Sequence, residues 1–294
     1  AYIIAMFHLF THAFFKALLF LGSGCVIHSF KEEQDIRLMG GVWKKIPNTY
    51  ALMMIGTLAL TGFPFLSGFY SKDAIIEFAF LKGTNMGYYA SAVGVITAFL
   101  TAIYSWRLIF KTFHGKFNNK KNTLISIQES PIVMVLPSCI LAAGAILSGF
   151  LFKSLFIGET TEFWNNSIFV LNVISNAHPP TWFIMLTPII VMITIPIAYY
   201  LFIKNEKILK NLILRNQKIY NFLLNKWYFD ELYNFIFVKP AKKIGLFFWK
   251  SIDIKIIDRF GPDGISEIIK ILSLKARRFQ SGYIYQYAFV MLLG

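Results

Sequence analysis

The chain has 294 residues, of which 56% are hydrophobic and only 15% are charged, whereas soluble domains carry roughly 25% charged residues. Its mean hydropathy is +0.57, and a soluble monomer of this composition would expose large apolar patches. The composition therefore excludes a soluble enzyme, a secreted disulfide scaffold and a disordered tail. It favours a protein whose solvent is the lipid bilayer.

The net charge of +14 raises the question of an anionic partner. Sixteen of the 29 Lys and Arg residues lie between Lys204 and Arg278, beside seven acidic residues. These charges alternate with Phe, Ile and Leu, so lipid headgroups or partner subunits are the expected neighbours. We therefore predict no nucleic-acid binding.

Five apolar stretches are long enough to cross a bilayer, which takes about 20 residues: 1–30, 48–82, 86–114, 131–152 and 179–203. A sixth begins near 282 and reaches the last residue, Gly294. Because the chain begins with Ala1 inside an apolar run and lacks a charged leader, we interpret it as part of a longer membrane protein. The sequence thus predicts an all-α integral membrane protein.

The stretch 48–82 is too long for one plain span, and it contains Gly62, Pro64 and Gly68. Proline lacks a backbone N–H and breaks a helix, especially beside glycine. We therefore predict two half-helices, 48–62 and about 69–82, which are joined by a short unwound segment.

Basic residues recur in alternate loops. The regions 31–47, 111–130 and 204–280 carry most of them, whereas the loop at Lys82 and the region 153–178 carry few. If 48–82 counts as one crossing, every basic region lies on the same side. The positive-inside rule assigns that side to the cytoplasm, or to the matrix of an organelle.

Residues 204–280 are too charged to cross a membrane, yet apolar residues recur there at helical spacing. After a break at 261–264, the same spacing resumes. The apolar positions are Ile244, Phe247, Phe248, Ile252, Ile256, Ile265, Ile268, Ile269 and Leu272. This pattern predicts an amphipathic helix on the membrane surface or on neighbouring subunits, and a solvent-facing linker helix is the alternative.

Lys16 lies at the middle of the first apolar stretch. A lysine at the bilayer centre costs about 3 kcal/mol, so it needs a partner, water or a function. His12 and His8 precede it by four and eight residues, on the same helix face. Either histidine alone is typical of a structural role, but the three together predict a proton relay. No carboxylate or cysteine lies nearby to complete a metal site, so we predict none.

A second group of ionisable residues follows the break at Pro64, in the run Ser71-Lys72-Asp73. Lys72 and Asp73 form either a structural ion pair or a gate for proton exit. The broken helix favours the gate, since interrupted spans border protein or water-filled cavities. Hydroxyl side chains either line a wet path or bond to their own helix; these are Thr57, Thr61, Ser67, Thr97, Thr101 and Ser105.

The sequence predicts no cofactor in this chain. Cys25 and Cys139 lie inside apolar runs, which is typical of small buried residues and not of disulfide or metal spacing. It contains no glycine-rich phosphate loop, haem motif or iron–sulfur cysteine pattern. We therefore expect no redox chemistry here.

Several runs resemble one family. FHLFTHAFFKALLFLGSGCVIH at 7–28, DIRLMGG at 35–41 and GFPFLSGFYSKD at 62–73 resemble the family of subunit L of bacterial NADH-quinone oxidoreductase, that is, respiratory complex I. Its mitochondrial counterpart is chain 5 of NADH-ubiquinone oxidoreductase. The run WYFDELYNFIFVKP at 227–240 is similar to the start of that family's C-terminal extension.

The resemblance implies the C-terminal half of an Mrp-antiporter-like bundle. The expected parts are proton-channel helices of the second inverted repeat at 1–152, a periplasmic-side loop and a further span at 153–203, a cytoplasmic-side segment with a long lateral amphipathic helix at 204–281, and a truncated last span at 282–294. By motif, Lys16 matches the family's central lysine, and His8 and His12 match its histidines. Lys72 and Asp73 match the pair at the proton exit. The family's Glu–Lys pair of the first repeat is expected upstream of Ala1.

The function that follows is proton translocation driven by reactions in other subunits. NADH, FMN, iron–sulfur clusters and quinone are expected in those partners, with subunits M and N as neighbours. The expected location is the bacterial inner membrane, or the mitochondrial inner membrane for an organellar gene. An A-like subunit of an Mrp-type Na+/H+ antiporter is the alternative, and a purely structural scaffold is disfavoured by Lys16.

Overall fold

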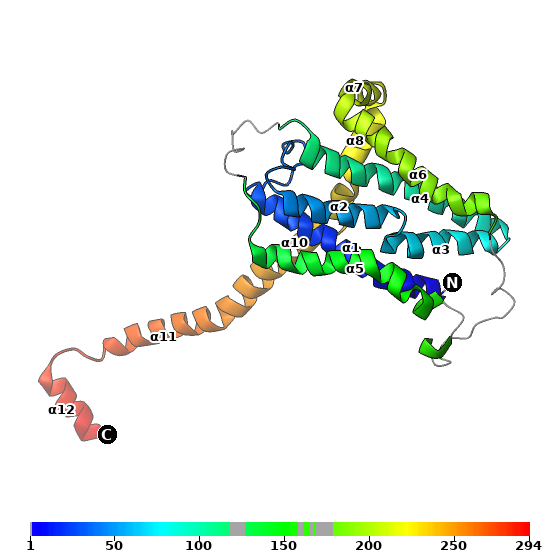
Figure 1. Ribbon diagram of the computed structural model, residues 1–294. Coiled ribbons are helices and arrows are strands. Elements are labelled where there is room, and N and C mark those ends of the chain that lie inside the picture. Colours follow the sequence, from blue (N-terminus) through cyan, green and yellow to red (C-terminus); the bar gives the residue numbers. More distant parts are fainter. Residues whose placement is uncertain (1, 118–126, 158–160, 165–166, 168–178) are drawn as a thin grey trace. The chain divides into compact units, whose positions relative to one another are not determined.

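A computed structural model describes residues 2–117, 127–157, 161–164, 167 and 179–294 (Figure 1). Every regular element in these residues is a helix, so the predicted all-α fold is confirmed. The chain divides into two compact units, Ala1–Leu212 and Ile213–Gly294.

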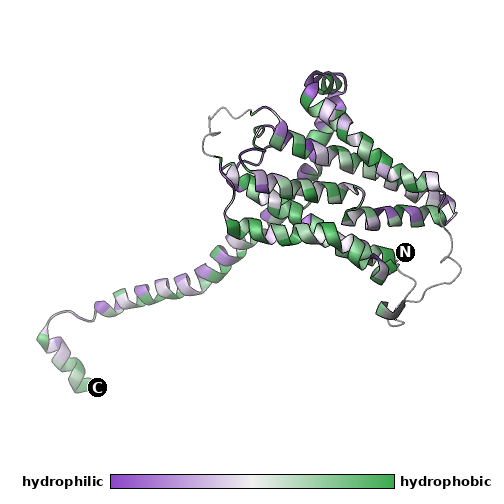
Figure 2. Cartoon of the chain, in the orientation of Figure 1, coloured by the Kyte–Doolittle hydropathy of each residue, from purple (hydrophilic) through white to green (hydrophobic). Residues whose placement is uncertain are grey.

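The first unit contains four helices that are long and apolar enough to cross a membrane. They are α1 (Tyr2–Ser29), α4 (Asn85–Ile109), α5 (Ile132–Ile157) and α6 (Thr181–Tyr199). Short π-helical turns extend α4 to His114 and α6 to Lys204. Hydrophobic residues predominate along these helices (Figure 2), as a bilayer requires.

Two shorter helices, α2 (Pro47–Thr61) and α3 (Ser67–Leu81), follow one another through the middle of this unit. α1 and α5 pack against each other and against both short helices, while α4 also packs on both and on α6 (Figure 1). The interrupted pair is therefore enclosed by longer helices. Unwound backbone at membrane depth is tolerated in such a position.

The break between α2 and α3 follows from its local sequence. Gly62 ends α2 with a left-handed backbone, φ 81°, and Pro64 cannot continue a helix. Phe65 is also left-handed, at φ 71°. α3 then begins at Ser67, two residues before the predicted start at 69. Gly68 lies against α2, where a Cβ atom would overlap the Ala59 carbonyl oxygen.

The basic loops meet at one end of the first unit. The backbone N–H of Trp43 donates to the carbonyl of Phe113 over 3.3 Å, and Lys111 forms an ion pair with Glu206. In the same loop region, the hydrogen bond from the Arg37 side chain lowers the pKa of the Asp35 carboxyl. At the other end, Phe80 stacks on Phe183 with 4.1 Å between ring centroids. The side of the membrane that each end faces stays a prediction.

The second unit is a series of helices whose side chains are almost all exposed. Helical segments run from α8 (Gln217–Leu224) through α9 (Phe229–Tyr233) and α10 (Lys239–Phe247) to a π-helical segment ending at Asp258. α11 (Pro262–Arg277) follows the break at Gly261, and α12 (Ile284–Leu293) ends the unit. In α8, α10 and α11, polar and apolar residues lie on opposite sides, as predicted for an amphipathic segment; Figure 2 shows both kinds of residue along α11.

The predicted division of the chain into four parts, with boundaries at 152, 203 and 281, assigns each part to a position in or beside the membrane. This division stays a prediction. The same holds for the inverted repeat.

Candidate proton-transfer site

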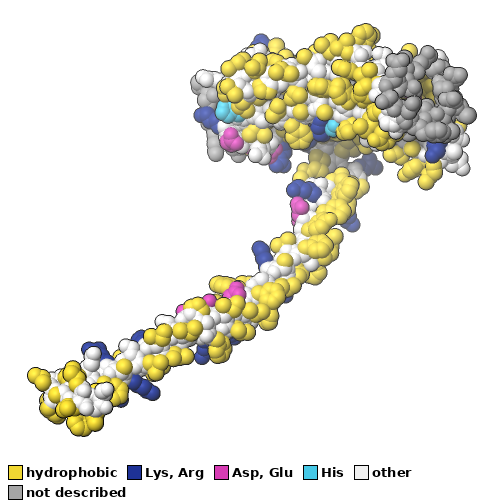
Figure 3. Space-filling view, turned by 90° about the horizontal axis from the view of Figure 1, so that it is seen from below, with side chains coloured by type: hydrophobic (Ala, Val, Ile, Leu, Met, Phe, Trp, Pro, Cys, Tyr) yellow, Lys and Arg dark blue, Asp and Glu magenta, His cyan; other side chains and the backbone are white. Residues whose placement is uncertain are grey.

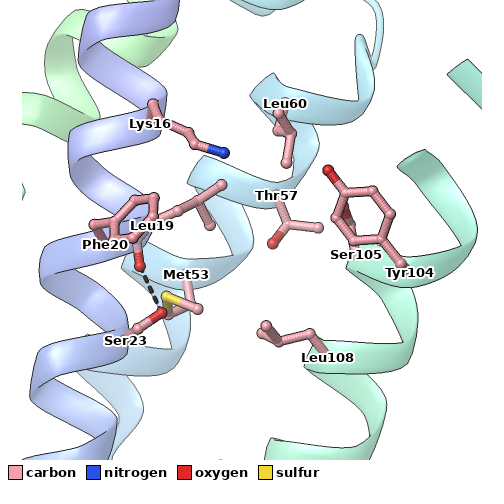
Figure 4. Close-up of a pocket in the computed structure, with 10 residues that line it drawn as sticks. All are labelled: Lys16, Leu19, Phe20, Ser23, Met53, Thr57, Leu60, Tyr104, Ser105 and Leu108. Carbon is pink, nitrogen blue, oxygen red and sulfur yellow. Dashed lines mark hydrogen bonds between the residues drawn. The ribbon is translucent and has the colours of Figure 1, made fainter. Parts of the chain in front are cut away.

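Lys16 projects from α1 toward a pocket of about 190 Å³ that is bounded by α1, α2 and α4 (Figure 4). The pocket is lined by apolar side chains and by four hydroxyl groups, those of Ser23, Thr57, Tyr104 and Ser105. Among the described residues no group hydrogen-bonds to the Lys16 ammonium, which lies 5.4 Å from the centre of the Phe20 ring. A water molecule occupies about 30 Å³, so the pocket has room for several waters beside the ammonium.

His12 and His8 continue from Lys16 along the same helix. His12 is close enough to Lys16 to interact with its charge, and His8 is close enough to interact with the charges of His12 and Lys72. The centroids of the two imidazole rings are 5.7 Å apart, so the two rings are direct neighbours on the helix. The predicted common face of Lys16, His12 and His8 is therefore present in the structure.

A pair of buried hydroxyls joins this face of α1 to α3. His8 Nδ1 lies 3.0 Å from Ser71 Oγ, and Thr11 Oγ1 donates to the same oxygen over 2.7 Å. Ser71 also donates to the Ser67 carbonyl over 3.2 Å. These hydrogen bonds connect the histidines to α3, the helix that carries Lys72. Thr11 and Ser71 are fully buried.

Lys72 and Asp73 lie at the helix break but do not pair with each other. The Lys72 ammonium donates to the carbonyl of Thr61, at the end of α2. Glycine at position 62 makes room for it, because a Cβ atom there would lie 2.7 Å from Lys72 Nζ. Asp73 is only 5% exposed, and within the described part of the chain neither carboxylate oxygen has a hydrogen-bond partner.

The other hydroxyl candidates divide into two groups. Thr57 and Ser105 line the Lys16 pocket, as a wet path requires. Thr61 and Thr97 donate to carbonyls of their own helices. Ser67 is fully buried, and its hydroxyl has no partner among the described residues. Thr101 is half-buried.

Sequence reasoning gave no role to Thr11, Ser71 or Tyr104. Thr11 follows His8 by three residues, so it shares the helix face of the histidines. The spacing therefore indicates, from the sequence alone, that Thr11 lies beside the histidines. Which residues of α3 and α4 face α1 is decided by tertiary packing, so the sequence carries no comparable signal for Ser71 or Tyr104.

The arrangement is suited to moving protons. Among the described residues, no group of three or more His, Cys, Asp or Glu side chains is placed to hold a metal ion. The structure places seven groups that can carry or relay protons in one part of the bundle. They are the Lys16 amine, the His12 and His8 imidazoles, the Thr11 and Ser71 hydroxyls, the Lys72 amine and the Asp73 carboxylate. Such groups accept and donate protons directly or through water.

Comparison with known proteins gives two family matches that together span nearly the whole chain. Residues 1–101 match the family described as NADH:quinone oxidoreductase/Mrp antiporter, TM. Residues 104–294 match the family described as NADH dehydrogenase subunit 5 C-terminus. All five predicted site residues lie within the first match.

Individual relatives agree with these matches. Over its whole length the chain is 42% identical to NADH-ubiquinone oxidoreductase chain 5 of Phytophthora infestans and 43% identical to that of Marchantia polymorpha, and it covers 45% of each. It is 38% identical to NADH-quinone oxidoreductase subunit L of Rhodobacter capsulatus, of which it covers 51%. The chain thus spans about half the length of the curated relatives it matches.

Proposed function

The chain belongs to the NADH dehydrogenase subunit 5 family, and from this membership we propose that it is the C-terminal half of a proton-translocating, antiporter-like subunit of respiratory complex I. In this proposal NADH oxidation and quinone reduction take place in other subunits, which hold NADH, FMN, iron–sulfur clusters and quinone. This chain holds no cofactor and transfers protons only.

The observation that carries the proposal is the series of polar groups that lies between the Lys16 pocket and the helix break. Lys16 stores the proton, and waters in its pocket connect it to His12. His12 passes the proton to His8, whose Nδ1 lies 3.0 Å from the Ser71 hydroxyl. Each step moves one proton between a nitrogen or oxygen donor and the next acceptor, so no other reactant is required.

The helix break provides the exit gate. Its carbonyl at Thr61 accepts a hydrogen bond from the Lys72 ammonium, and the C-terminal end of α2 favours a cation there. Asp73 lies beside it with both carboxylate oxygens unpaired in the described structure. When Lys72 gives up its proton, Asp73 is the adjacent acceptor on the same helix.

The proposal includes a location and neighbours. The apolar helices place the protein in a membrane, and we assign it to the inner membrane of a bacterium or a mitochondrion. The antiporter-like subunits M and N are its proposed partners. The amphipathic segment within 231–278 contacts them in this assignment.

Replacement of Lys16 by Met tests the proposal. The assembled complex with Lys16→Met is reconstituted into proteoliposomes, and the number of protons translocated per NADH oxidised is measured. We expect this ratio to fall while the variant still assembles. Lys153→Met is the matched control, because Lys153 lies over the Tyr70 ring, outside the polar series. An unchanged ratio for Lys16→Met would contradict the proposal and favour a structural scaffold.

A second candidate, an A-like subunit of an Na+/H+ antiporter, is favoured by the first family match, whose description also names Mrp antiporters. A native gel of solubilised membranes, stained for NADH dehydrogenase activity and analysed by mass spectrometry, separates the two. Co-migration of this chain with the large active band supports complex I. Migration in an NADH-inactive band supports the antiporter.

A further inference from the structure

Glu129 caps the N-terminus of α2 from another part of the chain. Its carboxylate accepts hydrogen bonds from the backbone N–H groups of Asn48, over 2.8 Å, and Thr49, over 3.3 Å. It also accepts one from the Thr49 hydroxyl. N–H groups in the first turn of a helix have no intrahelical partner and form the positive end of its dipole. Ile46, which precedes the helix, offers no side-chain cap.

The segment that carries Glu129 is itself attached to α1. Ser130 donates to the Cys25 carbonyl over 3.0 Å, and its oxygen lies 3.4 Å from that of Ser29. Ile127, at the other side of Glu129, is buried. The carboxylate is therefore held in place relative to α1, which is also the helix of Lys16, His12 and His8.

α2 consequently lies between two charged side chains. A carboxylate, Glu129, binds its N-terminal end, and an ammonium, Lys72, binds the Thr61 carbonyl at its C-terminal end. Both charges complement the helix dipole. The two ends of this 15-residue helix are about 22 Å apart at 1.5 Å per residue, and between them Met53, Thr57 and Leu60 line the Lys16 pocket.

Close packing sets the approximate position of α2 along its axis. Polar contacts at its ends add directional restraints, which hydrophobic contact itself lacks. α2 packs closely against α1 at Gly22 with Met53 and at Gly56 with Leu19, and against α3 at Gly68 with the Ala59 carbonyl. Directional contacts occur at the ends of α2. At its N-terminal end, Tyr50 bonds to His114 over 3.0 Å, which ties α2 to α4, while Glu129 ties it to α1.

We propose that Glu129 is a positioning residue for proton transfer. Its carboxylate adds a directional restraint on the axial position of α2 against α1, and thereby helps to hold Thr57 in the Lys16 pocket and the Thr61 carbonyl at Lys72. This inference rests on the proposed function. Glu129 itself transfers no proton.

The test uses the assembled complex in proteoliposomes and compares Glu129→Gln with Glu129→Asp. The glutamine keeps the shape but loses the charge, so we expect protons translocated per NADH to fall at least twofold. The aspartate restores a carboxylate and should recover most of that loss. Glu33→Gln is the matched control, because Glu33 accepts backbone N–H groups of its own loop at the same end of the bundle. It should behave as wild type.

If Glu129→Gln translocates as many protons per NADH oxidised as the wild type (a wild-type proton ratio), the inference is overturned. Equal losses in the Gln and Asp variants would overturn it as well, since they would indicate a loss of stability without a role for the carboxylate. If Glu129→Gln does not assemble, Thr49→Val removes only the hydroxyl donor to Glu129. A smaller but measurable fall is then expected, and a wild-type ratio overturns the inference.

Lys72→Met, measured in the same series, separates this inference from the proposed function. If Lys72→Met also translocates protons normally, the proposed function fails. If Lys72→Met is defective and Glu129→Gln is not, only the role of Glu129 fails.

Discussion

At the level of single residues, the first unit pairs some of its buried polar groups and leaves others unpaired. Thr11 and Ser71 satisfy each other deep in the bundle, which offsets the cost of burying hydroxyls away from water. The Asp73 carboxylate and the Ser105 hydroxyl are equally buried but have no partner in the described residues. Such groups require water or a proton. In the proposed function, the Asp73 carboxylate and the Ser105 hydroxyl lie at the two ends of the polar series.

Replacement of Ser71 by Ala tests the contact between α1 and α3. It leaves His8 Nδ1 without its partner, whereas Thr11 Oγ1 keeps its bond to the His8 carbonyl. A buried group left unpaired costs about 1–3 kcal/mol. We expect a lower thermal unfolding midpoint in detergent and a lower proton ratio in proteoliposomes.

Ser91→Ala provides the comparison for this prediction. Ser91 is also buried, but among the described residues its hydroxyl bonds only to the Tyr88 carbonyl of its own helix. It should lose less stability and keep the proton ratio. If the two alanine variants have the same proton ratio, Ser71 has no part in the path.

At the level of helices, the decisive feature is the break between α2 and α3. The helices approach one another closely here. Gly68 lies against the Ala59 carbonyl, and Gly149 of α5 lies against Ser67. At neither glycine is there space for a Cβ atom. This packing brings the end of α2 to the start of α3. The Lys72 ammonium can then reach the Thr61 carbonyl.

Replacement of Gly68 by Ala is expected to disrupt this break. The new methyl group would overlap a backbone oxygen that cannot rotate away, and overpacking typically costs about 1–3 kcal/mol. The chain should assemble poorly, as measured by its amount in the purified complex. Gly24→Ala is the matched control, since a Cβ atom there meets nothing within 4 Å. Equal amounts of the two variants would show that the close approach is dispensable.

The helices and their interruption could be predicted from sequence because their signals are local. Apolar length defines α1, α4, α5 and α6, and Gly62 with Pro64 marks the break. Lys16, His8 and His12 could be grouped because they share one helix. The contacts of His8 with Ser71 and of Glu129 with Thr49 join residues 63 and 80 positions apart. No local pattern encodes them, since they arise only when the helices pack.

At the level of the whole molecule, much apolar surface remains uncovered. The side of the first unit seen in the space-filling view is mostly hydrophobic (Figure 3), as expected for helices that face lipid. In the second unit, the apolar side of α11 includes Ile268 and Ile269, which are 59% and 60% exposed. An amphipathic helix of this kind is stable when lipid or another subunit covers its apolar side.

Replacement of Ile269 by Lys tests whether that side is covered in the assembled complex. A lysine there would place an unpaired charge in an apolar contact, which is unfavourable. We expect less of this chain in the large NADH-active band of a native gel. Ser266→Lys adds the same charge on the polar side of α11, where solvent accommodates it, and should migrate as wild type. If Ile269→Lys is recovered in the active band as fully as Ser266→Lys, then the apolar side of α11 is not a contact in the assembly, and the amphipathic segment is a linker in water.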